Sequence, residues 1–298
     1  MEPDGIILID KPQGITSHDV VYRLRRLLRT QKIGHTGTLD PDATGLLVVL
    51  VGRAAKAAEY VTADAKTYEA TMTLGVTTDT QDATGSVISR SDDIPTLCEV
   101  TSAVASFEGE YQQIPPMYSA LKRDGRKLVD LARRGVEIER EPRTVFISSV
   151  SAEQTGSRDY SLRVSCSKGT YIRTLCDDIG KKLGCGACMS SLRRIRSGGY
   201  SVDDAIPLDE CARLTYEELT GRLIPTETLF CDLPVLKLSG FFLKLCKSGC
   251  EIYQKKINTG FETGARVRLY DDEGFFALGQ VGEYEDGSAV KSIKVFRL

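Results

Sequence analysis

Residues 34–51 read GHTGTLDPDATGLLVVLV. The last six of these residues, Leu46 to Val51, have the length and the β-branched content of a fully buried strand. The residues before them are polar and rich in glycine, which permits backbone conformations and close approaches that other residues resist. We therefore expect a tight polar turn that holds a carboxylate at the start of a buried strand. The alternative is that Asp40-Pro41-Asp42 makes only a surface turn, because Asp-Pro favours turn initiation.

The residues upstream of this segment predict a strand followed by a helix. Residues 6–9 are apolar and lead into the turn-like sequence DKPQG at 10–14. Thr16 and Asp19 have the spacing of a capping box, with Asp in place of Glu or Gln. Apolar residues at 20, 21, 24, 27 and 28 then recur at helical spacing, with arginines between them. We expect an amphipathic helix with a basic outer side.

Further elements follow along the chain. Strands are predicted at 67–75, 143–150 and 160–166, and a helix from about 171 to 183, begun by Gly169 and capped by Thr170. We assign residues 1–233 to a mixed α+β catalytic domain with an inserted basic lobe at about 110–143. Residues 234–298 hold short strand candidates at 267–270, 275–281 and 293–298, separated by acidic, glycine-containing turns. This pattern predicts a small β-rich C-terminal domain.

Length and composition fit a protein of about two domains, since domains average roughly 150 residues. The chain has 298 residues, of which 41% are hydrophobic and 27% charged. Its longest apolar run, Leu46 to Val51, is far shorter than the roughly 20 residues that span a bilayer. The N-terminus lacks a basic segment before an apolar one, so we expect no signal peptide and a cytoplasmic protein. The nine cysteines then read as reduced thiols.

The overall charge argues against a nucleic-acid partner, but the local charge argues for one. The net charge is −2 and the pI about 5.9, whereas nucleic-acid-binding domains are often strongly basic. Residues 19–32 nevertheless carry five Lys/Arg against one acid, and residues 122–143 carry eight against five. Arg193, Arg194 and Arg196 form a third cluster. Binding responds to the local field, so three basic clusters on an acidic background favour a polyanionic partner.

Arg173 falls in the first turn of the predicted helix, where the helix dipole disfavours a cation. Such an arginine often serves a fixed carboxylate or phosphate, for which its fork geometry is suited. The alternative is an exposed arginine paired with Asp177 four residues on.

Several other chemistries are not supported. No Gly-Lys-Ser/Thr follows the glycine-rich segment, which excludes a phosphate-binding P-loop. The chain has two histidines, His18 and His35, at no metal-binding spacing, and we expect no metal and no cofactor. Cys185 and Cys188 form a CxxC, and Cys246 and Cys250 form a looser pair. Four thiolates could bind zinc, but the second spacing is irregular and the pairs fall in different predicted domains. A redox context is not clear either, so we interpret them as structural thiols.

Several segments, in this order, together resemble the tRNA pseudouridine synthase B (TruB) family. The matching stretches are DKPQGITSHDVV at 10–21, Ile33 to Leu47, Lys66-Thr67-Tyr68, Leu74-Gly75, Thr78-Asp79-Thr80, QIPPMYSALK at 113–122, Lys168 to Leu175, and Leu192-Arg193-Arg194. The resemblance implies a pseudouridine synthase fold, in which a mixed sheet carries a cleft and the inserted lobe grips RNA. It implies an isomerase that converts uridine 55 in the TΨC arm of tRNA to pseudouridine. The residues after 234 resemble the family's PUA-like tail only weakly.

The same resemblance implies roles for individual residues. The catalytic aspartate falls on Asp40, with Arg173 paired to it, and Tyr68 stacks on the uracil and helps to remove the C5 proton. His35, Tyr171 and Leu192 line the pocket that holds the flipped nucleotide. A positioned carboxylate can attack the sugar or take a proton from it, and the sequence leaves both open. We expect a monomer whose partner is tRNA. We expect no membrane association and no cofactor.

The sequence leaves two alternatives to a tRNA pseudouridine synthase. A non-catalytic RNA-binding or tRNA-folding protein on the same scaffold would explain the basic clusters but not the grouping of Asp40, Tyr68 and Arg173. A guide-RNA-directed synthase acting on ribosomal RNA would be expected to carry a lysine-rich tail, which this chain lacks.

Overall fold

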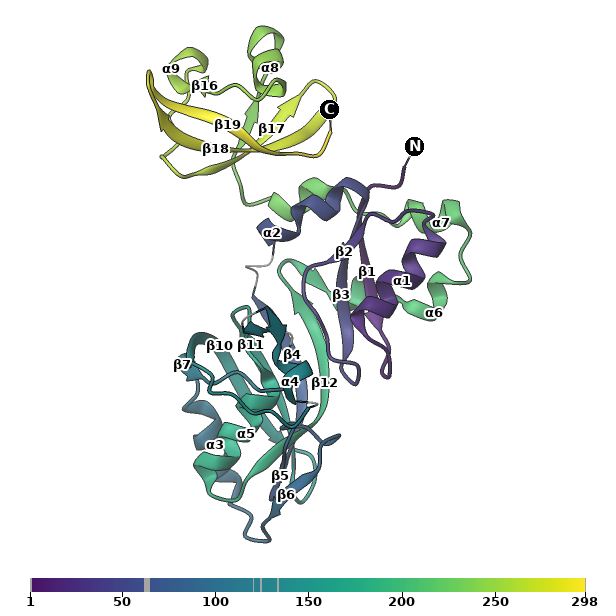
Figure 1. Cartoon of the computed structure of the whole chain (residues 1–298), viewed down its shortest axis with the longest axis vertical. Coiled ribbons are helices and arrows are strands. Elements are labelled where there is room, and N and C mark those ends of the chain that lie inside the picture. Colours follow the sequence, from purple (N-terminus) through teal and green to yellow (C-terminus); the bar gives the residue numbers. More distant parts are fainter. Residues whose placement is uncertain (1, 62–64, 120, 124, 133, 298) are drawn as a thin grey trace.

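The computed structural model describes residues 2–61, 65–119, 121–123, 125–132 and 134–297 (Figure 1). Within them, ten strands form one large mixed sheet. These are β1 (Gly5–Lys11), β2 (Ile33–His35), β3 (Thr44–Val51), β4 (Lys66–Leu74), β7 (Gly109–Gln113), β10 (Arg143–Gln154), β11 (Asp159–Cys166), β12 (Ala187–Ser197), β13 (Tyr200–Ser201) and β14 (Ile206–Pro207). Their order is β14-β1-β3-β12-β4-β11-β10-β7, with β2 paired to β3 and β13 to β12. The predicted α+β class with a mixed sheet is confirmed.

Helices and short hairpins flank the strands, and the last two helices pack in the C-terminal part of the chain. The α-helices are α1 (Ser17–Leu27), α2 (Ala58–Val61), α3 (Leu97–Ala105), α4 (Leu128–Ala132), α5 (Ile172–Leu183), α6 (Leu208–Cys211), α7 (Tyr216–Gly221), α8 (Gly240–Lys247) and α9 (Gln254–Ile257). The 3₁₀ helices are η1 (Gly52–Ala57), η2 (Val202–Asp204) and η3 (Thr226–Phe230). The two hairpins pair β5 (Val76–Thr78) with β6 (Val87–Arg90), and β8 (Lys122–Arg123) with β9 (Arg126–Lys127).

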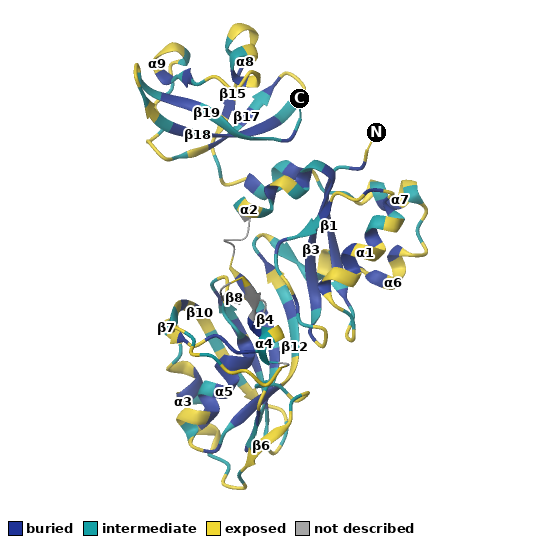
Figure 2. Cartoon of the chain, viewed as in Figure 1, coloured by how far each residue is buried: buried dark blue, intermediate teal, exposed yellow. Residues whose placement is uncertain are grey.

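The large sheet has two halves with separate cores, and β12 joins them. One core packs α1, α6 and α7 against β1 and β3, and the other packs α3 and α5 against β4 and β11 (Figures 1 and 2). Strand β12 pairs along its length with β4, but it meets β3 in parallel at only two register pairs, Arg193 with Thr44 and Arg194 with Gly45. Gly45 permits this approach, since its φ is +98° and a Cβ there would lie 2.3 Å from the Arg194 carbonyl oxygen. The loop before β3 therefore lies at the junction of the halves.

The elements predicted near the N-terminus are confirmed. Strands β1 and β3 pair antiparallel from Gly5–Val51 to Lys11–Gly45. Thr16 is the N-cap of α1, and its hydroxyl accepts a hydrogen bond from the Asp19 N–H while the Asp19 carboxylate accepts one from the Thr16 N–H. The capping box satisfies N–H groups that the first helical turn leaves free.

Two local predictions were wrong. Thr170 does not cap α5, since the N-cap is Tyr171 and the Thr170 hydroxyl instead donates to the Ser167 carbonyl. His35 belongs to strand β2, because edge pairing with β3 extends into the polar segment. The two ends of the predicted lobe meet in the large sheet, where Gln113 of β7 pairs with Arg143 of β10.

The C-terminal part of the chain forms a separate five-stranded sheet in the order β15-β17-β18-β19-β16. Its strands are β15 (Val235–Lys237), β16 (Ile252–Tyr253), β17 (Arg266–Asp271), β18 (Gly274–Tyr284) and β19 (Gly287–Val295). It lies at one end of the molecule, next to α2 (Figure 1). Lys294 forms an ion pair with Glu59 at 2.5 Å, and Lys56 donates to the Val295 carbonyl. Among the described helices, none is long and apolar enough to cross a membrane.

Candidate active site

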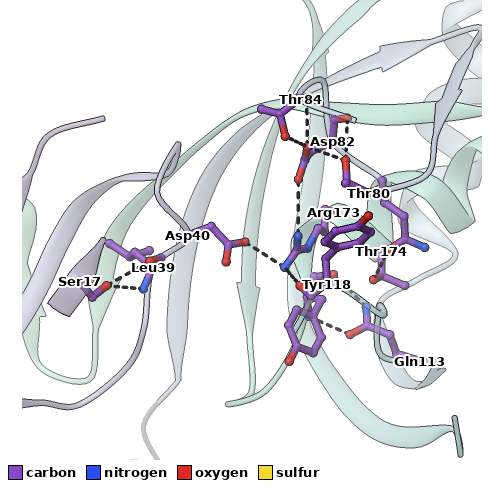
Figure 3. A network of polar contacts seen from close by, with 12 residues as sticks. Ser17, Leu39, Asp40, Thr80, Asp82, Thr84, Gln113, Tyr118, Arg173 and Thr174 are labelled. Atoms are coloured by element: carbon purple, nitrogen blue, oxygen red, sulfur yellow. Dashed lines mark hydrogen bonds and ion pairs between the residues drawn. The ribbon is translucent and has the colours of Figure 1, made fainter. Parts of the chain in front are cut away.

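The loop that carries Asp40 connects β2 to β3 and is held by the start of α1. The Ser17 hydroxyl accepts a hydrogen bond from the Leu39 N–H at 2.8 Å and lies 3.1 Å from the Leu39 carbonyl oxygen (Figure 3). The Gly14 N–H donates to the Pro41 carbonyl at 2.9 Å. Ser17 is buried, whereas the Asp40 side chain is 46% exposed. The backbone on both sides of Asp40 is thus fixed while its carboxylate faces outward.

Lys11 provides a second attachment for this loop. Its side chain is fully buried at the end of β1, and Nζ donates to the carbonyl oxygens of Pro12, Ile15 and Pro41 at 2.7–3.0 Å. Burial lowers the pKa of the Lys11 ammonium, although the nearby carboxylates oppose this shift. An ammonium has three donors, and all three are used: two bind carbonyls within residues 12–15, and the third joins this segment to Pro41, 30 residues from Lys11.

Arg173 faces Asp40 from the other half of the molecule. Its Nη2 lies 3.1 Å from Asp40 Oδ2 and donates to the Tyr118 carbonyl at 2.7 Å, while Nη1 lies 3.5 Å from Asp82 Oδ2 (Figure 3). The side chain is only 7% exposed. The alternative pairing of Arg173 with Asp177 was wrong, because the Asp177 carboxylate bonds Lys181 at 2.6 Å and the Gln81 amide. A buried guanidinium held by several acceptors is well suited to orient the Asp40 carboxylate.

Asp82 orients Arg173 from a tight polar turn between β5 and β6. Asp82 Oδ1 accepts hydrogen bonds from the Thr80 hydroxyl and from both the N–H and the hydroxyl of Thr84, at 2.6–3.0 Å (Figure 3). These three donors hold Oδ1 and leave Oδ2 directed at the arginine. The family resemblance included Thr78 to Thr80, but Asp82 was not predicted as a site residue. The sequence pattern that could have indicated Asp82 is its position two residues from Thr80 and two from Thr84.

We predict that replacing Asp82 by asparagine lowers kcat by about tenfold to a hundredfold, because it weakens a charge-assisted contact to Arg173. The expected effect on KM for RNA is small, since Asp82 does not line the cavity described below. Asp92→Asn is the matched control: Asp92 also pairs with an arginine, Arg158, but is fully exposed. Equal rates for both variants would show that Asp82 does not act through Arg173.

A cavity of about 370 Å³ opens beside the Asp40–Arg173 pair. Both halves of the molecule and the inserted lobe contribute described residues to its wall. Of the six site residues predicted from the sequence, five line it: Asp40, Tyr68, Tyr171, Arg173 and Leu192. His35 is not among the described residues that line it. Lys66, Ser119, Lys168 and Arg194 also line the cavity and were not predicted to do so.

Tyr68 and Arg194 form the buried side of the site, and His35 is half-buried within range of the Arg194 charge. Arg194 is 1% exposed and donates to the carbonyl oxygens of Leu46 and Gly37. Burial raises the pKa of the Tyr68 phenol, and Arg194 partly opposes this. Burial and the Arg194 charge lower the pKa of His35, so its imidazole stays neutral at neutral pH. Tyr68 is buried and lines the cavity.

Tyr171 is fixed by the pair of residues at the base of the lobe. The buried Gln113 amide donates to the Tyr171 carbonyl at 3.0 Å and accepts from its N–H at 2.8 Å. The Arg143 guanidinium stacks 4.7 Å from the Tyr171 ring centre and donates to the Gly169 carbonyl. Gln113 thereby replaces the missing side-chain cap at the start of α5.

The basic clusters are only partly available to a polyanion. Arg194 is buried, and Arg193 forms a two-bond ion pair with Asp10 at 2.7–3.0 Å, so the third cluster was a wrong prediction except for the exposed Arg196. On α1, Arg23 lies 3.5 Å from Asp209, and Arg29, two residues after the end of α1, stacks on Tyr216. These arginines serve contacts within the protein, because α6 and α7 pack beside α1 (Figure 1).

Cys185 and Cys188 are buried, and burial raises the pKa of both thiols. A thiolate is the reactive form, so burial disfavours redox work at this pair. The nine cysteines are all free. No cluster of potential metal ligands occurs among the described residues.

The fold and the site together define a pseudouridine synthase: a mixed sheet whose junction carries a carboxylate–arginine pair beside a tyrosine in one cavity. The TruB family pseudouridylate synthase N-terminal domain matches residues 25–172, and the tRNA pseudouridylate synthase B C-terminal domain matches residues 173–230. The chain belongs to the TruB family. It is accordingly an isomerase that converts uridine to pseudouridine.

Individual relatives agree with this assignment. The tRNA pseudouridine synthase B of Burkholderia mallei is 42% identical over 94% of this chain and 94% of its own length. That of Aromatoleum aromaticum is 40% identical over 98% of this chain and 92% of its own length. A chain in the crystal structure of a Cbf5–Nop10–Gar1 complex superposes with a TM-score of 0.73 at 27% identity, over 99% of this chain and 85% of that one.

Proposed function

We propose that the enzyme acts on tRNA, at uridine 55 of the TΨC arm, with Asp40 as its catalytic carboxylate. The observation that carries this proposal is the Asp40–Arg173 ion pair, 3.1 Å long, in the wall of a cavity that Tyr68 also lines. The relatives at 40–42% identity are named as enzymes of tRNA, and the match extends over nearly the whole chain.

The reaction exchanges one sugar–base bond for another. The bond between C1′ and N1 breaks, the uracil turns, and C5 bonds to C1′; C5 then loses its proton and N1 gains one, so no external oxidant or reductant is needed. The Asp40 carboxylate can add to C1′ or take a proton from C2′, and Arg173 orients it in either case. Reaching the base requires that the nucleotide be flipped from the folded RNA, which costs a few kcal/mol. In this proposal the flipped base is received by three residues that line the cavity, Tyr68, Tyr171 and Leu192.

The remaining assignments belong to the same proposal. We place the catalytic domain at 1–233, with the lobe at about 110–143 as the RNA grip, and a PUA-like domain at 234–298; the separate C-terminal sheet, which begins at Val235, supports this division. The enzyme acts as a cytoplasmic monomer without a cofactor. His35, which the resemblance assigns to the pocket, is half-buried, and its Nδ1 has no partner among the described residues.

The wild-type protein alone is expected to release tritium from C5-labelled uridine in a tRNA transcript, without guide RNA, protein partner, metal or nucleotide. A transcript with cytidine at position 55 and all other uridines labelled is the control, and it should release none. No release from any tRNA would favour the non-catalytic RNA-binding alternative. Release only after addition of a guide RNA would favour the guided enzyme. Release from both transcripts would contradict the assignment of position 55.

A further inference from the structure

We propose that the hydroxyl of Ser119 donates a hydrogen bond to a carbonyl oxygen of the flipped uracil. Ser119 thus reads the substrate base directly, and it belongs to the inserted lobe, not to the large sheet. The inference rests on the proposed function, since it takes a uridine in the cavity as given. It adds a base-contacting residue to the Asp40, Tyr68 and Arg173 group.

The first support is that the Ser119 hydroxyl is buried and lacks a partner. The residue is 4% exposed, and its Oγ forms no hydrogen bond to any described residue. Buried polar groups in folded proteins nearly always have partners, so an unpaired hydroxyl requires an explanation. Ser119 also lines the cavity beside Asp40. A ligand in that cavity would supply the missing partner.

The second support is the position of Ser119 relative to the reacting atoms. The carbonyl of the preceding residue, Tyr118, accepts a hydrogen bond from Arg173 Nη2, the same nitrogen that contacts Asp40 (Figure 3). The Ser119 backbone is fixed as well, because its N–H donates to the Met117 carbonyl and its carbonyl accepts from the Val129 N–H of α4. The hydroxyl is therefore held on the cavity wall within reach of a base whose sugar contacts Asp40.

The third support is chemical. The guanidiniums in the cavity wall already have protein acceptors: Arg173 bonds Asp40 and Tyr118, and Arg194 bonds Leu46 and Gly37. A neutral hydroxyl can donate without adding charge next to the carboxylate. When uracil turns about its N3–C6 axis so that C5 replaces N1, O2 and O4 exchange places. A fixed donor that contacts one of these oxygens before the turn finds the other in the same place afterwards.

The test compares Ser119→Ala, Ser119→Thr and Ser119→Cys with the wild type, on a TΨC-arm hairpin with uridine at position 55. We expect kcat/KM for tritium release to fall roughly tenfold in Ser119→Ala, to recover largely in Ser119→Thr, which keeps the hydroxyl, and to stay low in Ser119→Cys, whose thiol is a weak donor. Ser106→Ala, at the end of α3 away from the cavity, is the control and should not change the rate. Thermal unfolding of each variant checks that it is folded.

A second experiment measures the affinity for a hairpin that lacks the base at position 55. It distinguishes a contact between Ser119 and the base from any other role of the Ser119 side chain. We expect wild type and Ser119→Ala to bind this hairpin equally and to differ only on the hairpin with uridine. An equal loss of affinity on both hairpins, or full activity of Ser119→Cys together with low activity of Ser119→Thr, would overturn the proposal and indicate that the side chain only fills space. Failure of the wild type itself to release tritium would count against the proposed function instead.

Discussion

Replacing Asp40 by asparagine is expected to reduce the rate of tritium release by at least ~10³-fold, while tRNA binding stays close to that of the wild type. Asparagine has nearly the same shape but can neither add to the sugar nor accept its proton at neutral pH. Binding should survive because the Asp40 side chain is half-exposed and Arg173 keeps a second carboxylate, Asp82, at 3.5 Å. Single-turnover tritium release and filter binding with the same transcript measure the two quantities.

Asp42 offers a matched control two residues away. It lies in the same loop and is exposed, but it does not line the cavity. Asp42→Asn is expected to retain wild-type turnover and binding. Retained turnover in Asp40→Asn would contradict the catalytic assignment. Loss of binding together with turnover would instead give Asp40 a role in holding RNA.

Local patterns in the sequence were enough to predict the elements that surround the site. The apolar run from Leu46 to Val51 became β3, and the Thr16–Asp19 spacing became a capping box. Both signals lie within a few residues, where backbone hydrogen bonds and burial of one stretch decide the outcome. The start of α5 was placed correctly, but its cap was not, because Gln113 replaces the cap from nearly 60 residues away.

The contacts that build the site join distant segments, and no local pattern specifies them. Asp82 reaches Arg173 across 91 residues of sequence, and Arg194 reaches Leu46 across 148. The clustering of arginines in the sequence was misleading about the binding surface for the same reason. Arg194 counts toward a basic cluster in the sequence, yet in the fold it lies in the core with carbonyl partners. Whether an arginine is a surface cation or a structural donor depends on which backbone it meets, and that is a property of the tertiary structure.

Replacing Lys11 by methionine is expected to destabilise the protein by about 2–4 kcal/mol and to lower turnover at least tenfold. Methionine fills much of the same space, but it leaves the carbonyl oxygens of Pro12 and Ile15 without the Lys11 donor, at about 1–3 kcal/mol for each group that water cannot reach. The Pro41 carbonyl also loses its lysine and keeps the Gly14 N–H. Loss of the charged lysine from a buried position offsets part of this cost. The rate falls because Pro41 directly follows Asp40, so a freed loop no longer holds the carboxylate against Arg173.

Thermal and denaturant unfolding measure the first effect, and tritium release well below the unfolding temperature measures the second. Lys32→Met is the control, because Lys32 is largely exposed and pairs only with Glu2 at the surface, where an ion pair contributes little. A folded Lys11→Met variant with normal turnover would show that the lysine stabilises the fold without positioning Asp40. A variant of normal stability but low turnover would show the reverse. We expect both properties to change together, because one ammonium joins the end of β1 to the loop that carries the catalytic group.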